Sequence, residues 1–289
     1  MDKGILYIVS TPIGNLGDMS PRAVDTLKKV SLIAAEDTRV TMKLTSHFDI
    51  STPLTSCHQH NERGKSSEIV RRMLDENIDV ALVTDAGTPA ISDPGTFLVK
   101  EAAAAGIPVY AVAGPSAMAA AVSVSGFDIT EFTFFGFLPR QKGELKEKLY
   151  DIASRCTCAV IHESPYRVKE MVKTITETLP GALISASCDL TKLHELTLRG
   201  SAEEIFRALD ENEKSDKGEY CLVVDLRNVK LPEKETPSAD ITVEAKLVEA
   251  MISEGTDLRG AMEILKRNGE KKNAVYAASL NLRKLFCDE

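Results

Sequence analysis

Three loops in the first half of the sequence combine glycine and proline with small polar residues, a composition typical of ligand-binding loops. They cover residues 10–18, 84–95 and 113–117, and each follows a short apolar run and precedes a helical pattern. Small side chains let backbone amides approach a ligand closely. The loops have neither Walker nor G-x-G-x-x-G spacing, so they do not indicate phosphate as the ligand. Taken singly, each loop is also explained by turn formation alone.

Three side chains that could take up a proton follow other strand-like runs. Asp37, Glu62 and His60 are our candidates for a catalytic base or for a group that orients it. A base that accepts a hydroxyl proton contributes on the order of 10²–10⁴ in rate. For Asp37 a structural role stays open, because Asp is a common N-cap and a helical pattern follows it. His58 and His60 lie two residues apart without a third ligand nearby, so we predict no metal site.

Strand-like and helical runs alternate through the first part of the chain. The candidate strands cover residues 5–9, 32–35, 54–57, 78–83 and 109–113. This alternation predicts a parallel sheet with helices on its faces, and the three loops would then line one crevice at its carboxyl edge. Two helix starts show an N-cap residue followed by proline, namely Ser20-Pro21 and Asp93-Pro94.

A second alternating region follows residue 115. Its candidate strands cover residues 132–136, 159–162, 183–188 and 220–224, and its candidate helices cover residues 144–154, 167–179 and 202–209. We therefore predict the α/β class, with one α/β domain over residues 1–115 and a second over residues 116–230.

A short polar segment with two prolines, residues 230–238, reads as a linker to a small C-terminal module over residues 238–289. The module shows three helical patterns, at residues 243–253, 258–268 and 273–285. Between residues 259 and 284 there are seven Lys or Arg and two Glu, a local charge of +5. This pattern favours a helix-turn-helix-like RNA-binding module, although a solvated helical face with ordinary lysines would look the same.

The bulk composition is that of a soluble globular protein. The formal net charge of −8 argues against indiscriminate binding to nucleic acid, but it allows a local basic face. The six cysteines are scattered without the paired spacing of a zinc site, which favours free thiols in a reducing cytoplasm. The sequence leads directly into a strand-like run and has no apolar run near the roughly 18 residues of a membrane span, so we expect a cytoplasmic protein without a membrane partner.

Several motifs, in this order along the chain, resemble those of the tetrapyrrole methylase superfamily. The three loop motifs are Thr11-Pro12-Ile13-Gly14-Asn15, Asp85-Ala86-Gly87-Thr88-Pro89 and Gly114-Pro115-Ser116-Ala117. Four more narrow the resemblance to its RNA-modifying branch: Ala34-Ala35-Glu36-Asp37-Thr38-Arg39, Ser56-Cys57-His58-Gln59-His60-Asn61-Glu62, Gly136-Phe137-Leu138-Pro139-Arg140 and His162-Glu163-Ser164-Pro165-Tyr166-Arg167. The resemblance runs from residue 5 to about residue 224, and the basic tail resembles the C-terminal helical module of that branch.

The resemblance implies two α/β domains that hold S-adenosylmethionine in the cleft between them, usually in a homodimer. Carried over by position, the cofactor-binding residues are Pro12, Asp85, Ala86, Gly87, Thr88, Ile91, Ser116, Ala117, Glu163 and Leu190. The commoner Gly-Asp-Pro of the superfamily stands here as Gly87-Thr88-Pro89, so a hydroxyl replaces a carboxylate. Asp85 is the residue that could compensate, and Tyr166 either covers the cofactor or simply packs.

The same resemblance implies a substrate, a cytidine in the decoding centre of 16S ribosomal RNA that is methylated on its ribose 2′-oxygen. We assign Arg39 and Arg140 to RNA phosphates, with support from Lys43, Arg63 and Lys142. Two alternatives stay open. A precorrin-like methylase would act on a small molecule and have no use for the basic tail, and a non-catalytic module would bind a nucleoside on or near the ribosome.

Overall fold

A computed structural model describes residues 4–231 and 242–286 of the chain. The chain divides into two compact units, residues 1–231 and residues 232–289. Most of the expected linker at residues 230–238, and the first residues of the expected C-terminal module, lie outside the described residues.

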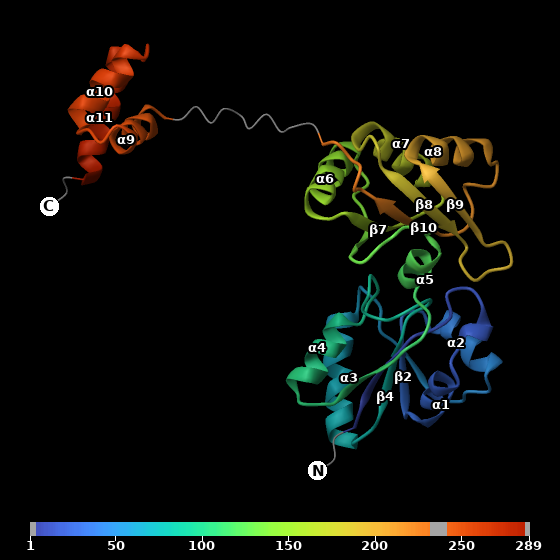
Figure 1. The fold of residues 1–289 in the computed structure, drawn as a ribbon. Helices are drawn as coiled ribbons and strands as arrows, with labels where there is room; N and C mark the ends of the chain where they lie inside the picture. Colours follow the sequence, from blue (N-terminus) through green and yellow to red (C-terminus); the bar gives the residue numbers. More distant parts are fainter. Residues whose placement is uncertain (1–3, 232–241, 287–289) are drawn as a thin grey trace. The chain divides into compact units, whose positions relative to one another are not determined.

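The first sheet of the larger unit is fully parallel, and its five strands follow the order β3-β2-β4-β1-β5 (Figure 1). The strands are β1 (Leu6–Val9), β2 (Leu32–Ala35), β3 (Leu54–Ser56), β4 (Val80–Val83) and β5 (Val109–Val112). Strands β2 and β4 are buried along their whole length, as expected for strands covered on both faces. The strand that precedes each of the three glycine-rich loops is β1, β4 or β5, and these are neighbours, so the loops meet at one carboxyl edge.

Helices cover both faces of this sheet. They are α1 (Pro21–Lys29), α2 (Thr38–His47), α3 (Glu62–Glu76) and α4 (Thr96–Ala104). Ile69, Met73 and Leu98 of α3 and α4 pack against one face, while Ala23 and Leu27 of α1 pack against the other (Figure 1). Helix α1 starts as predicted, because the Ser20 side chain accepts the Ala23 amide hydrogen and proline follows it.

The start of α4 differs from the prediction, since neither Asp93 nor Pro94 begins the helix. The N-cap is Gly95 and the helix starts at Thr96. The cap comes instead from another helix, because Oε1 of Glu62 accepts the amide hydrogens of Gly95 and Phe97, each at 2.8 Å. A carboxylate at a helix N-terminus satisfies free amides and interacts well with the helix dipole. Asp93 is thereby left in the loop.

The second sheet is mixed, in the order β6-β7-β10-β8-β9. Its strands are β6 (Thr133–Phe137), β7 (Cys158–Glu163), β8 (Leu183–Cys188), β9 (Leu196–Ser201) and β10 (Tyr220–Asp225). Only β6 and β7 pair in parallel, and the central strand β10 is antiparallel to both of its neighbours. We did not predict β9, because the apolar alternation of Leu196-Thr197-Leu198-Arg199 covers only four residues and none of the strand is fully buried.

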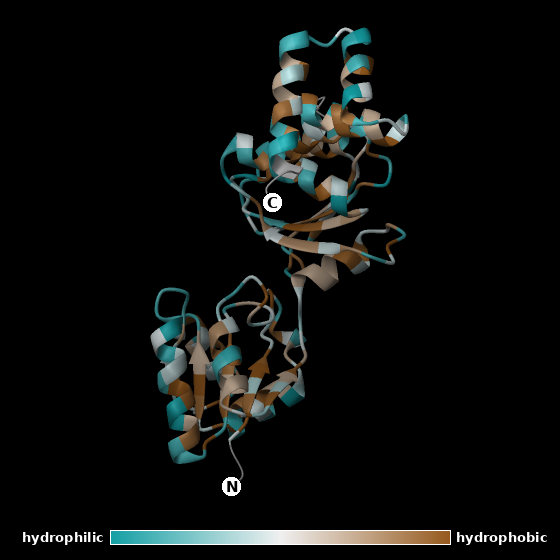
Figure 2. Ribbon diagram, turned by 90° about the vertical axis from the view of Figure 1, so that its left-hand side faces the viewer, coloured by the Kyte–Doolittle hydropathy of each residue, from teal (hydrophilic) through white to brown (hydrophobic). Residues whose placement is uncertain are grey.

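Three helices cover one face of the second sheet, and a fourth lies on the other (Figure 1). The three are α6 (Lys142–Arg155), α7 (Val168–Thr178) and α8 (Ala202–Glu211), and the fourth is α5 (Ala117–Val124). The chain leaves the first sheet after β5, and Ala121 of α5 packs with Val160 and Val223 of the second sheet. Ile13, from the loop after β1, belongs to the same apolar cluster. The predicted α/β class is confirmed, and the strands form the apolar interior (Figure 2).

The C-terminal unit contains three helices with a core of their own. They are α9 (Val243–Ser253), α10 (Leu258–Arg267) and α11 (Lys272–Phe286), close to the predicted ranges. Leu247, Leu265 and Val275 are buried between them. The Asp257 side chain caps α10 by accepting the Gly260 amide hydrogen.

Candidate functional site

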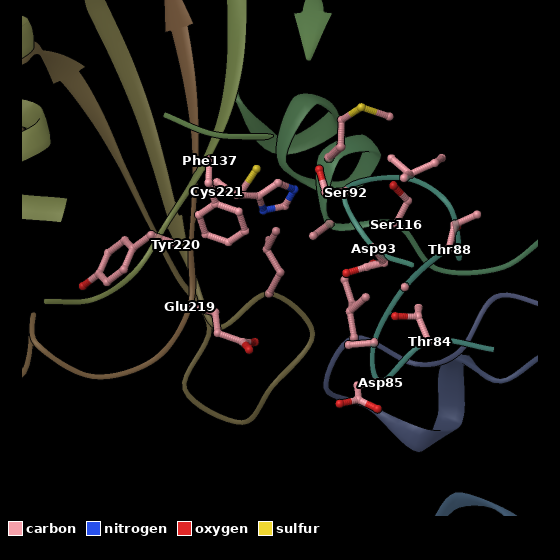
Figure 3. Close-up of a pocket in the computed structure, with 18 of the residues that line it drawn as sticks. Thr84, Asp85, Thr88, Ser92, Asp93, Ser116, Phe137, Glu219, Tyr220 and Cys221 are labelled. Atoms are coloured by element: carbon pink, nitrogen blue, oxygen red, sulfur yellow. The ribbon is translucent and has the colours of Figure 1, made fainter. Parts of the chain in front are cut away.

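A cavity of about 450 Å³ is lined by the carboxyl-edge loops of the first sheet and by strand ends of the second. Ligand pockets for small molecules and cofactors commonly have volumes of about 300–1,000 Å³. Thr88, Asp93 and Ser116 lie on one wall, and Phe137 and Cys221 lie on the other (Figure 3). The cavity therefore lies at the carboxyl edge of the first sheet, where ligands commonly bind, and is large enough for a cofactor and the reacting group of a substrate.

Hydrogen bonds between loops make the first-sheet wall rigid. The backbones of Thr11 and Gly87 form a reciprocal pair, with N···O distances of 2.9 and 3.1 Å. The hydroxyls of Ser10 and Thr88 are 2.9 Å apart, which joins the same two loops at a second point. Gly87 has a φ of +90°, a conformation that side chains rarely adopt, so the sharp turn depends on glycine. Backbone amides of this loop are thus held in place without help from a ligand.

Nine of the ten predicted cofactor-binding residues line this cavity. They are Asp85, Ala86, Gly87, Thr88, Ile91, Ser116, Ala117, Glu163 and Leu190. The tenth, Pro12, is buried and is not one of the lining residues, whereas its neighbour Ile13 is. Residues distant in sequence are therefore brought together largely as the resemblance implies.

The three predicted catalytic groups lie outside the cavity lining. Asp37 caps α2 by accepting the Arg39 amide hydrogen and forms an ion pair with the Arg39 guanidinium at 2.6 Å. These bonds from Arg39 lower the pKa of the Asp37 carboxyl to about 2, so it is a weak proton acceptor. Glu62 is buried as the cap of α4, and His60 is exposed in the turn before α3. The N-cap role left open for Asp37 is therefore seen in the structure.

Other carboxyl groups do line the cavity on the first-sheet side, and sequence reasoning had not selected two of them. Oε2 of Glu36 accepts hydrogen bonds from the Thr84 hydroxyl and from the Asp85 amide. Burial, with the charges of Glu36 and Asp85 nearby, raises the pKa of Asp93 to about 6. Burial also raises the pKa of Asp85. Of these two aspartates, Asp93 shows the larger rise in pKa.

On the opposite wall, Glu163 and His162 project from the end of β7. Glu163 is 2 % exposed, and its Oε1 accepts the Ser164 amide hydrogen at 2.8 Å. Its Oε2 is buried without a hydrogen bond and lies 3.3 Å from the Arg167 guanidinium. His162 packs between the rings of Phe134 and Phe137, and burial lowers its pKa, which favours the neutral imidazole.

These features fit the parts of S-adenosylmethionine. Backbone groups and hydroxyls of the loops at residues 84–95 and 113–117 can bind polar atoms, and the unsatisfied oxygen of Glu163 can accept a hydrogen bond from a hydroxyl or an ammonium group. Apolar side chains cover the rest of the wall, as the rings of an adenosine require: Ile13, Ile91, Met118, Phe134 and Leu190.

The predicted RNA-binding residues are spread over the surface of the same unit, and all five are exposed. Arg39 pairs with Asp37, and Arg63 lies over the Phe97 ring, with its guanidinium carbon 4.9 Å from the ring centroid. Lys142 forms ion pairs with two glutamates of α7. The remaining two, Lys43 and Arg140, form no ion pair or cation–π contact with another residue that the structure describes.

Sequence reasoning missed several lining residues, and in two cases a usable signal existed. Glu36 directly follows β2 and is the neighbour of Asp37, and Glu36 is the one of the two that lines the cavity. The strand-end argument selected Asp37 alone, although Glu36 has the same place at the end of the strand. His162 precedes the predicted Glu163 at the end of β7 and also lines the cavity, so its position offered the same signal. Glu219 and Cys221 could not have been found in this way, because they reach the cavity only through the antiparallel pairing of β10.

Comparison with known sequences places the chain in a family. The family described as tetrapyrrole (corrin/porphyrin) methylases matches residues 5–205. The chain belongs to the tetrapyrrole methylase family. The matched range of this methylase includes both sheets except β10, and all three glycine-rich loops.

Curated relatives of this methylase match nearly its whole length. One from Bacillus subtilis (strain 168) is 40 % identical over 279 residues, which are 96 % of this chain and 94 % of the relative. One from Pseudomonas aeruginosa is 36 % identical over 282 residues, or 97 % of this chain and 98 % of the relative. Both are named ribosomal RNA small subunit methyltransferase I.

Solved structures show the same fold at low sequence identity. Diphthine synthase aligns with a TM-score of 0.60 at 11 % identity, covering 78 % of this methylase and 91 % of that chain. The methyltransferase CobJ aligns with a TM-score of 0.56 at 16 % identity, covering 79 % of this methylase and all of that chain. At such identities the likeness concerns the fold alone.

Other features of the described residues bear on the remaining predictions. In residues 4–231 and 242–286, no three His, Cys, Asp or Glu side chains are grouped so that they could hold a metal ion. Within the same ranges, no helix is both long and apolar enough to cross a membrane. The five cysteines of this part of the methylase are free thiols, and Cys287 lies outside it.

Proposed function

We propose that the protein is an S-adenosylmethionine-dependent methyltransferase that acts on 16S ribosomal RNA and methylates the ribose 2′-oxygen of a cytidine in the decoding centre. The observation that carries the proposal is the match, over 96–97 % of the chain, to relatives named for small-subunit ribosomal RNA methylation. The cytidine and the 2′-oxygen come from the motif resemblance, and they are part of the proposal. The cavity supports it with a cofactor-sized site.

In this proposal the predicted residues keep their roles at the cavity. Ala86, Gly87 and Thr88 bind the amino-acid and ribose parts of the cofactor, mainly through their backbone. Ser116 and Ala117 border the adenosine, and Glu163 and Leu190 complete the site from the second sheet. The cofactor supplies a methyl group on a sulfonium, so the protein has mainly to align donor and acceptor. Alignment of this kind can supply about 7–11 kcal/mol of the barrier.

Exposed aromatic side chains beside the cavity suit an RNA substrate. Phe137, which lines the cavity, is 62 % exposed, and Tyr166, next to the lining residue Pro165, is 84 % exposed. The Arg167 guanidinium donates to the Leu138 and Pro139 carbonyls and so ties the two segments together. Unpaired bases of RNA stack on such side chains. A side chain as exposed as that of Tyr166 is not held by packing, which leaves its ring free for a ligand.

A basic stretch in the C-terminal unit also supports the proposal that the substrate is RNA. Residues 259–284 of this unit carry seven Lys or Arg and two Glu, a local charge of +5 in a chain of net charge −8, and α11 carries Arg283 and Lys284 in its last turn. This basic stretch would hold the phosphate backbone while the larger unit carries out the reaction. We include the homodimer in the proposal, and sedimentation of the purified protein tests it.

The deciding experiment measures methyl transfer to purified small ribosomal subunits from cells that lack the gene. We expect transfer of one methyl group per subunit, and mapping of ribose methylation should locate it at one cytidine. Transfer should fall steeply with salt, because phosphate contacts release counterions. Bare 16S RNA and small-molecule acceptors are assayed in parallel. Transfer to the small molecules with none to subunits or RNA would contradict the proposal.

A second candidate is a small-molecule methylase, which the match of residues 5–205 to a family described as corrin and porphyrin methylases favours. The two candidates differ in their need for the C-terminal unit, since a small molecule offers no phosphate backbone to that unit. A non-catalytic nucleoside-binding module would show cofactor binding without turnover on any acceptor in the same assays.

A further inference from the structure

Most carboxyl groups of the cavity already have strong partners. Glu36 accepts two hydrogen bonds, and Asp85 accepts the Asp37 amide hydrogen at 3.1 Å. Glu163 accepts the Ser164 amide hydrogen and lies beside Arg167, while Glu219 pairs with Lys192 at 3.0 Å. Asp93 has no cationic partner among the contacts of the described residues, and the contact it has is with the uncharged Thr84 hydroxyl.

The loop around Asp93 is held in a strained shape that points to function. Ala90 and Ser92 have φ values of +65° and +64°, although neither is glycine. Such residues cost of order 1–3 kcal/mol each and cluster at active sites. The loop also reaches the second sheet, because a Cβ on Gly136 of β6 would lie only 2.8 Å from the Ser92 hydroxyl. Asp93, the next residue, is therefore held at a fixed place in the cavity wall (Figure 3).

We infer that Asp93 is the catalytic base that takes the proton of the acceptor hydroxyl during methyl transfer. The inference rests on the proposed function, and it replaces Asp37, Glu62 and His60, which lie outside the cavity lining. In this step the hydroxyl oxygen forms a bond to the methyl carbon while the carbon–sulfur bond breaks. The electron pair of that bond stays on sulfur, which becomes neutral, and the hydroxyl proton moves to a carboxylate oxygen of Asp93.

The protonation behaviour of Asp93 is consistent with this role. Burial and the charges of Glu36 and Asp85 raise its pKa to about 6. The other titratable groups that line the cavity, on the side of the second sheet, are His162, Glu163, Glu219, Tyr220 and Cys221. Burial raises the pKa of Tyr220 and Cys221 far above that of Asp93. A base whose pKa lies just below the working pH is ionised and still binds a proton well.

The test compares Asp93→Asn and Asp93→Glu with wild type in full-length protein, at saturating cofactor and saturating small subunits. We expect Asp93→Asn to lower kcat by about 10²–10⁴-fold, the usual contribution of a general base, and Asp93→Glu to recover part of the loss. The wild-type rate should rise with pH through about 6 and then level off, and Asp93→Asn should lose this inflection. The control is Asp75→Asn, an exposed aspartate of α3, which should behave as wild type.

Two further measurements distinguish a base at Asp93 from a binding role and from a base at His162. Calorimetric titration with the cofactor should give a Kd for Asp93→Asn within about threefold of wild type, whereas a loss of binding in step with kcat would make Asp93 a binding residue and overturn the inference. His162→Gln should keep the pH inflection, and its disappearance in that variant would assign the base to His162 and also overturn the inference. Absence of RNA methylation by wild type would instead reject the proposed function.

Protein stability provides a last check on the variant. The folded-state pKa of Asp93 lies above the ordinary 3.8, so its ionisation destabilises the fold as pH rises through about 6. Asp93→Asn should therefore melt no lower than wild type at pH 8. A much lower melting temperature would mean that the activity loss reports misfolding, and the pH profile of Asp93→Glu would then decide the inference.

Discussion

At the scale of single residues, several side chains that look catalytic in sequence are structural in three dimensions. Glu62 follows a strand and lies near histidines, yet it is 7 % exposed and caps another helix. Asp37 is similarly engaged with Arg39. The acidic groups that a ligand can reach are instead those that line the cavity, such as Asp93 and Glu163.

Glu62→Gln tests the structural role of the cap. The amide group keeps an acceptor oxygen but loses the negative charge that faces two amides of α4. Since hydrogen bonds to charged groups contribute about 1.5–3 kcal/mol, we expect the free energy of unfolding to fall by on the order of 1–2 kcal/mol. Urea denaturation measures it, with Glu68→Gln on the exposed side of α3 as the control. Equal stability of the two variants would argue against the cap.

Tyr166→Ala tests base stacking beside the cavity. Stacking contributes about 1–3 kcal/mol per base, so KM for RNA should rise about 5- to 150-fold. Tyr166→Phe keeps the ring and should remain near wild type. The melting temperature should not change in either variant, because the side chain is 84 % exposed. An unchanged KM in Tyr166→Ala would remove Tyr166 from the RNA-binding surface.

At the scale of elements, loops are positioned by contacts between segments far apart in sequence. The loop at residues 84–95 is held at Gly95 by a hydrogen bond to Glu62 of α3, and its Ser92 lies close to Gly136 of β6. Strand β6 makes room by a shift of register between Phe134 and Gly136, where Gly136 has a φ of +61°. The mutual fit of these two segments sets the width of the cavity at this point.

Gly136→Ala tests this fit. The new methyl would lie 2.8 Å from the Ser92 hydroxyl, and the positive φ adds a backbone cost of about 1–2 kcal/mol. We expect lower stability together with weaker cofactor binding, measured by urea denaturation and calorimetric titration. Adding Ser92→Gly should restore part of the binding but not the backbone cost. Purely additive effects of the two changes would mean that the segments do not interact.

At the scale of the whole molecule, the larger unit holds the cavity and the smaller unit has a separate core. Leu247, Leu265 and Val275 bury the inner faces of α9–α11 without help from residues 4–231. Because the cores are separate, the two units can have separate roles. In the proposed function the larger unit carries out the reaction and the C-terminal unit binds RNA.

Deletion of residues 238–289 tests this division. The remaining chain keeps the cavity residues, so its Kd for the cofactor should stay within about threefold of full-length protein. Methyl transfer to small subunits should drop by at least about tenfold, and the dependence of the remaining rate on salt should weaken, because fewer phosphate contacts are made. Activity on subunits equal to that of the full chain would favour the small-molecule candidate.

Local patterns in the sequence were enough to predict the strands of the first sheet, the starts of helices α1 and α2 and the three C-terminal helices. The reason is that apolar periodicity and N-caps such as Ser20 act over a few residues. The loops at residues 84–95 and 113–117 were recognisable for the same reason. Family motifs then predicted nine residues that do line one cavity.

Only the tertiary structure decided which acidic groups reach that cavity. Glu62 replaces Asp93 at the start of α4, and this contact joins residues 33 positions apart, which no local pattern contains. The antiparallel pairing of β10 brings Glu219 and Cys221 to the same wall. Protonation follows from burial and neighbouring charge, which depend on how segments distant in sequence pack together. Asp93 therefore reads as a helix cap in the sequence and lies in the cavity wall of the folded protein.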